Sequence, residues 1–76
     1  MDVERLVAMA NDIAAFFDSE TDKAIAAEGV RFHLVRFWDP RMRREIITHA
    51  QAGGAGLTAT AKSAVALLTN SPNQSK

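Results

Sequence analysis

The dipeptide Asp39-Pro40, near the middle of the chain, limits the possible folds more than any other feature of the sequence. A proline disfavours the helical conformation for the residue before it, so a helix that arrives from the N-terminal side has to end near Trp38. Proline also suits the first position of a helix, and aspartate suits the capping position before it. The pair therefore predicts that one helix ends at about Trp38 and that another begins at Pro40.

Two helices are predicted before this break. Asp2 can cap the first helix, and its apolar residues recur at steps of three and four until the polar stretch 18–21. These apolar residues are Leu6, Met9, Ala10, Ile13, Phe16 and Phe17. Thr21 or Asp22 caps the second helix. The residues along one side of that helix are Ile25, Val30, Leu34, Phe37 and Trp38. Gly29 weakens it by about 1 kcal/mol relative to alanine, so it is either continuous or split in two, and we favour one continuous helix.

Two more helices are predicted after the break. The third begins at Pro40, turns Met42, Ile46, Ile47 and Ala50 inward, and stops at Gly53-Gly54, where glycine allows a left-handed C-cap. Residues 53–56 form a flexible link. Thr58 caps the last helix, in which the apolar residues Ala61, Ala64, Val65 and Leu68 lie together. The expected fold is all-α, a small bundle of three to four helices. It has a single domain over residues 1–69 and a disordered polar tail over residues 70–76.

The chain is so short that its own core is expected to supply little stability, and a further source of stability is needed. Its 76 residues bury only about 60% of their unfolded surface, and such chains usually add disulfides, a structural metal or a partner. The absence of cysteine excludes disulfides and thiolate zinc sites. The two histidines, His33 and His49, are too few to hold a structural metal, so association with a partner remains. The chain opens without a secretory signal and has no apolar stretch of the roughly 20 residues that span a bilayer, so we expect a soluble cytoplasmic protein.

Opposite charges separate along the chain, although the net charge is zero. Residues 1–30 hold seven acidic and two basic side chains, a balance of −5. Residues 31–49 hold five arginines against Asp39 and Glu45, a balance of +3. Such a separation orients a partner.

The segment 36–44 carries four arginines, Phe37 and Trp38 around the break. Arginine and aromatic residues are enriched at the centres of protein interfaces, and two rings in one short run are difficult to bury together in so small a fold. We therefore expect a surface for pairing with a partner's acidic groups or a bound anion. A solvated basic face with ordinary pairs to Asp39 and Glu45 is the alternative. The predicted partner-binding residues are Arg36, Phe37, Trp38, Asp39, Pro40, Arg41, Arg43 and Arg44.

No set of residues in the sequence predicts a catalytic, cofactor-binding or metal-binding site. The glycines of residues 53–56 lack the Lys-Ser/Thr pair that follows them in a phosphate-binding loop. His33 and His49 belong to different predicted helices, with no carboxylate at a helical spacing to join them. We expect His33 on a helix surface and His49 at the edge of an apolar face, where either could donate or accept a hydrogen bond across an interface.

Three blocks of the sequence resemble a known family. They are Val-Ala-Met-Ala-Asn-Asp-Ile-Ala-Ala-Phe-Phe over residues 7–17, His33-Leu34 followed by Arg-Phe-Trp-Asp-Pro-Arg-Met-Arg over residues 36–43, and Gly-Gly-Ala-Gly-Leu over residues 53–57. Their order and spacing are similar to those of the delta subunit of NAD-dependent formate dehydrogenases, over most of the chain up to about Leu68. The block at 36–43 is the distinctive one.

The resemblance implies an accessory subunit of a soluble, molybdenum- or tungsten-dependent complex. In such a complex the large alpha subunit holds bis-molybdopterin guanine dinucleotide and oxidises formate. The beta and gamma subunits carry FMN and iron–sulfur clusters and pass electrons to NAD. The delta subunit binds no cofactor itself and supports assembly or stability, so we expect it to dock on the alpha subunit through segment 36–44. A self-associating helical protein, forming a homo-oligomer, and a helical nucleic-acid-binding module are the alternatives. The balanced net charge makes nucleic acid the poorer candidate.

Overall fold

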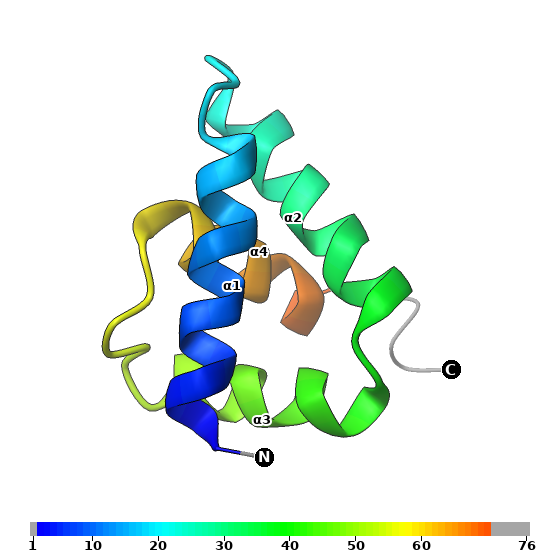
Figure 1. The fold of residues 1–76 in the computed structure, drawn as a ribbon, viewed down its shortest axis with the longest axis vertical. Coiled ribbons are helices and arrows are strands. Elements are labelled where there is room, and N and C mark those ends of the chain that lie inside the picture. The colour runs from blue at the N-terminus through cyan, green and yellow to red at the C-terminus, as the bar shows by residue number, and fades with distance from the viewer. Residues whose placement is uncertain (1, 71–76) are drawn as a thin grey trace.

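A computed structural model describes residues 2–70 of the chain. Over this range the chain forms four helices: α1 (Val3–Phe17), α2 (Lys23–Phe37), α3 (Pro40–Gln51) and α4 (Ala59–Asn70) (Figure 1). The predicted all-α fold is therefore confirmed. Of the predicted tail, residue 70 is the last residue of α4, and residues 71–76 lie outside the described range.

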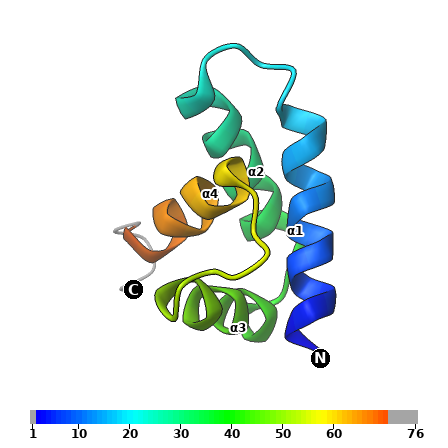
Figure 2. The same cartoon turned by 90° about the vertical axis from the view of Figure 1, so that its left-hand side faces the viewer.

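The helices form an antiparallel pair with two further helices packed against it. α1 and α2 run side by side in opposite directions, and residues 18–22 join them (Figure 1). α3 crosses the ends of this pair where α1 begins and α2 ends. α4 packs mainly against α2, and the connection from α3 climbs along the molecule to reach it (Figure 2). The bend between α2 and α3 thus lies at one end of the bundle.

The helix starts are set by the residues that the sequence marks as caps. Backbone N–H groups in the first turns of the four helices donate to the side chains of Asp2, Asp22, Asp39 and Thr58. These bonds satisfy amides that have no partner inside the helix. The cap of α2 is Asp22 rather than Thr21.

Glycines act at two places, one at the end of α3 and one within α2. Gly53 and Gly54 have φ values of +119° and +67°, and the Gly54 N–H donates to the carbonyl of His49 at 2.9 Å. This is the expected glycine stop. α2 passes through Gly29 without a break, which confirms a single helix. A β-carbon at Gly29 would lie 2.6 Å from the ring of Phe17, so glycine here lets α1 and α2 pack closely.

The core is built from medium-sized side chains and alanines. The largest fully buried side chains are Leu6, Val30, Leu34, Ile46, Val65 and Leu68. Buried alanines of α1, α2 and α4 lie between them and allow the helices to approach closely. The predicted inward residues of α3 and α4 all belong to this core or pack against it.

Three large apolar residues on the predicted stripes of the first two helices are exposed. Phe16 and Ile25, expected with the buried residues of their stripes, are 76% and 56% exposed, and Phe37, which was also predicted to bind a partner, is 65% exposed. Phe16 follows Ala14 by two positions and so points away from the buried side of α1. Ile25 lies on the side of α2 opposite Val30. Phe37 ends α2, beyond the helices that cover its inner side. No helix within residues 2–70 is long and apolar enough to cross a membrane.

Candidate partner-binding surface

The bend between α2 and α3 is held by its own residues. Trp38 and Asp39 have extended backbones, with ψ values of 140° and 165°, and the Asp39 carboxylate accepts from the Met42 N–H at 2.9 Å. The guanidinium of Arg43 donates to the carbonyls of Val35, at 3.1 Å, and Trp38. The last carbonyls of a helix lack intrahelical donors, and the guanidinium N–H groups of Arg43 act as donors to the carbonyls here. Arg43 therefore fastens the bend.

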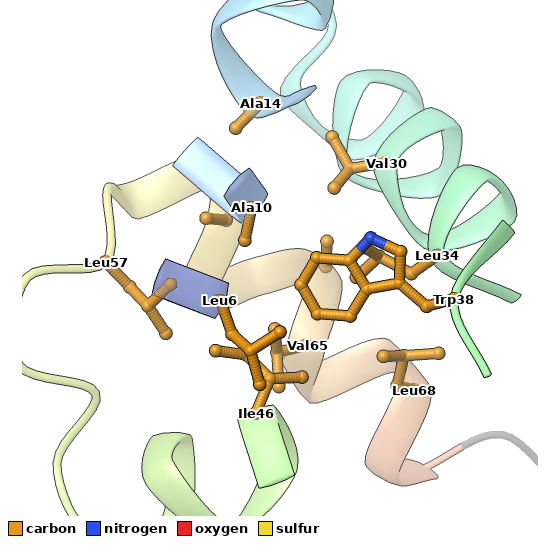
Figure 3. Packing of buried hydrophobic residues seen from close by; sticks show 12 residues of the cluster. Leu6, Ala10, Ala14, Val30, Leu34, Trp38, Ile46, Leu57, Val65 and Leu68 are labelled. Carbon is orange, nitrogen blue, oxygen red and sulfur yellow. The ribbon is translucent and has the colours of Figure 1, made fainter. Parts of the chain in front are cut away.

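Trp38 lies in the core, and the prediction that its indole is displayed to a partner is wrong. The side chain is 5% exposed and belongs to the same buried cluster as Leu34, Val65 and Leu68 (Figure 3). The backbone conformation changes between these two residues: Phe37 is the last helical residue, and Trp38 is extended. This change turns the Trp38 side chain back under α2. Among the buried residues of this cluster the indole is the one aromatic ring, and it lies with alanines and aliphatic side chains.

Phe37 takes the opposite direction. Its ring is 65% exposed and lies against two neighbours on α2. The centroid of its ring is 4.6 Å from that of the His33 imidazole, at an angle of 42° between planes, and the Arg36 guanidinium carbon lies 5.9 Å from it. The two adjacent rings are thus divided between the core and the surface.

Arg41 and Arg44 line an open groove of about 690 Å³ along α3, which Thr48, His49 and Val3 of α1 also line. The Arg41 Nε lies 3.8 Å from a Glu45 carboxylate oxygen, an exposed pair of the kind that contributes little stability. Arg44 forms no ion pair with any residue between 2 and 70. This side of α3 therefore carries cations that the fold leaves largely free.

The predicted site thus separates into two groups. Arg36, Phe37, Arg41 and Arg44 face outward, and we refer to these four as the bend surface. The remaining predicted residues have structural roles: Trp38 is buried, Arg43 holds two carbonyls, and Asp39 and Pro40 start α3.

The histidines also divide in this way. The Nε2 atom of His49 lies 2.8 Å from the carbonyl oxygen of Ala55, so this nitrogen forms a hydrogen bond within the chain. His33 is half-buried beneath the ring of Phe37. Within residues 2–70, no three side chains of His, Asp or Glu come close enough together to hold a metal ion.

Two features were not found from the sequence. Asn11 joins α1 to the connection before α4: its Nδ2 donates to the Gly56 carbonyl and its Oδ1 accepts from the Thr58 N–H, each at 2.9 Å. The other feature is an exposed apolar side of α2, which includes Phe32. Helical spacing alone could have found it, because Ile25 and Phe32 lie seven residues apart, on the side of the helix opposite Val30.

Comparison with known proteins identifies the family. A family model described as the NADH-dependent formate dehydrogenase delta subunit, FdsD, matches residues 5–65, which include the whole bend. No curated protein and no solved structure matches the chain significantly. The chain belongs to the FdsD family, the delta subunits of NADH-dependent formate dehydrogenase.

Proposed function

We propose that this chain is a non-catalytic, cytoplasmic accessory subunit of an NAD-dependent formate dehydrogenase. It docks through the bend surface on the large subunit that carries the molybdenum or tungsten cofactor, and it supports the assembly or stability of that complex. One observation carries the proposal: Phe37 is 65% exposed beside Arg36, within a stretch that the family match includes. Trp38 fills the core and Arg43 holds two carbonyls, so both have a role in the fold of residues 2–70, whereas the exposed ring of Phe37 has none.

The bend surface has the chemistry of an interface centre. The Phe37 ring would enter an apolar pocket of the large subunit, and the guanidiniums of Arg41 and Arg44 would pair with carboxylates around that pocket. The weak pair between Arg41 and Glu45 can be exchanged for such a contact at little cost. A subunit that binds only the folded, cofactor-loaded partner stabilises that partner by mass action.

The cofactors of the complex belong, in this proposal, to the other subunits. They are bis-molybdopterin guanine dinucleotide in the alpha subunit, and iron–sulfur clusters, FMN and the NAD site in the beta and gamma subunits. This chain has no cysteine, so it offers no thiolate for an iron–sulfur cluster or for molybdenum. Its role is therefore exerted through contact with the large subunit.

Affinity capture of the large subunit by the tagged chain tests the docking site. Phe37→Ala alone should weaken binding by about 2 kcal/mol, because an aromatic residue at the centre of an interface carries much of its binding energy. Combining it with Arg41→Ala and Arg44→Ala should abolish capture. The matched control is Phe16→Ala with Arg5→Ala, an exposed ring and an exposed arginine outside the bend surface. Equal capture by the triple variant and the control would show that docking uses another face.

A second measurement tests the role in assembly. Cells that lack the chain should contain less of the assembled, metal-loaded complex, and the wild-type chain should restore it. The triple variant should not restore it, although it folds normally. Normal amounts of loaded complex without the chain would rule out an assembly or stabilising role.

A further inference from the structure

A second exposed apolar surface lies on α2, away from the bend. Ile25, Phe32 and Val35 are 56%, 59% and 43% exposed and share one side of the helix, and we call these three residues the α2 stripe. The opposite side of α2 buries Val30 and Leu34 against the other helices. A helix that is apolar on both sides is normally covered on both sides, and within residues 2–70 only one side of α2 is covered.

The end of α1 extends this surface. The ring of Phe17 lies over Gly29, which is one helical turn from both Ile25 and Phe32. The exposed ring of Phe16 meets Phe17 edge to face, with ring centroids 5.2 Å apart. The apolar surface therefore crosses from α1 to α2. A continuous exposed patch of this kind marks an interaction site.

Charge is distributed along the α2 stripe in a self-complementary way. The connection beside the Ile25 end carries Asp18, Glu20 and Asp22 against one base, Lys23, which lies 3.8 Å from an Asp18 carboxylate oxygen, so this end stays acidic. The other end, beyond Val35, carries the exposed Arg36. A partner with one sign of charge would match one end of the stripe and oppose the other. A second copy turned end to end matches both ends at once.

We propose that this chain forms a twofold-symmetric homodimer in which the α2 stripes of two copies pack antiparallel. The midpoint between Ile25 and Val35 is residue 30, so Ile25 of one copy lies opposite Val35 of the other. The same pairing brings Arg36 of one copy about one helical turn from Glu28 of the other. Both residues are exposed. The Arg31 Nε donates to one carboxylate oxygen of Glu28 within the chain, at 2.9 Å, and the other carboxylate oxygen would accept from Arg36 of the second copy. Twofold symmetry makes each contact twice.

This proposal does not depend on the proposed function. The α2 stripe and the bend surface meet at Arg36, whereas the triple variant that tests docking leaves Arg36, Phe16 and the three residues of the stripe unchanged. Loss of docking and loss of self-association can therefore be observed separately.

Sedimentation of the purified full chain tests the dimer. At about 100 μM the wild-type chain should be dimeric, because a dissociation constant in the micromolar range leaves most copies paired. Phe32→Asp should weaken the dimer about a hundredfold or more, since each dimer loses the burial of two rings. Ser63→Asp adds the same charge on exposed α4 and should leave the dimer intact. A monomeric wild-type chain would mean that another protein covers the stripe, and a dimer that survives Phe32→Asp uses another face. Either result overturns the proposal.

Mixing two charge variants tests the antiparallel arrangement. Glu28→Arg places arginine against Arg36 in its own homodimer, and Arg36→Glu places glutamate against Glu28. Each variant alone should dimerise at least about tenfold more weakly than wild type, because like charges then face each other twice. A one-to-one mixture should dimerise again, since both contacts then pair opposite charges. A mixture that stays monomeric, with both chains folded by circular dichroism, would overturn the arrangement.

Discussion

Truncating Trp38 to alanine should remove a large share of the folding free energy. The indole is 5% exposed and is the largest side chain of the core, so its loss leaves a cavity that the surrounding alanines and leucines cannot fill. Replacing a buried tryptophan or phenylalanine by alanine costs about 3–5 kcal/mol. A chain of 76 residues has a total stability of about 4–11 kcal/mol, at about 0.05–0.15 kcal/mol per residue. The variant should therefore be marginally folded or unfolded at room temperature.

Urea denaturation of the purified chain, followed by circular dichroism, measures this effect. Phe37→Ala is the matched control, because Phe37 is the adjacent aromatic residue and is 65% exposed. It should change the free energy of unfolding by no more than about 0.5 kcal/mol, as is usual for surface substitutions. If Trp38→Ala costs less than about 1 kcal/mol, or no more than Phe37→Ala, the indole is not a core residue and the reasoning fails.

Two further substitutions test how the helices are held together. Gly29→Ala should lower stability by about 1 kcal/mol or more in the same denaturation assay, because its β-carbon would lie 2.6 Å from the Phe17 ring. A gain of about 1 kcal/mol, as helix propensity alone predicts, would contradict this packing. Asn11→Ala should cost about 1–3 kcal/mol through loss of the hydrogen bonds to Gly56 and Thr58, and amide exchange should increase at Thr58. Unchanged exchange there would show that Asn11 does not hold the connection.

The helices could be predicted because local chemistry determines where they begin and end. Asp39-Pro40 and Gly53-Gly54 act within one or two residues of their own positions, and the structure confirms both boundaries. The inward faces of α3 and α4 were also predictable. Each of these helices has one apolar side, so the direction of burial follows from periodicity.

The direction of Trp38 and Phe37 could not be predicted in the same way. Both residues stand where a helix ends, and a single change of ψ at the C-cap decides which ring enters the core. That change depends on how α3 crosses the bundle, which periodicity does not report. Arg43 is similar, because its guanidinium finds the end of α2 only after the bend has formed.

The predicted apolar side of α2 combined residues that lie on two sides of the helix, and this error has a physical reason. Apolar residues surround this helix, so periodicity does not select a buried face, and the small residues Ala26 and Ala27 turned out to line the buried side. Large apolar residues are usually expected inside, which led to the wrong placement of Ile25. Ile25 lies instead on an exposed apolar side of α2, which no other helix within residues 2–70 covers.

Site-specific photo-crosslinking in the assembled formate dehydrogenase tests the central claim most directly. A photoreactive phenylalanine analogue at Phe37 keeps the ring and adds a reactive group where the bend surface meets its partner. The account predicts a covalent adduct with the large subunit from position 37 and little or none from the exposed ring at Phe16. Adducts with the large subunit from position 16 and none from position 37 would contradict it.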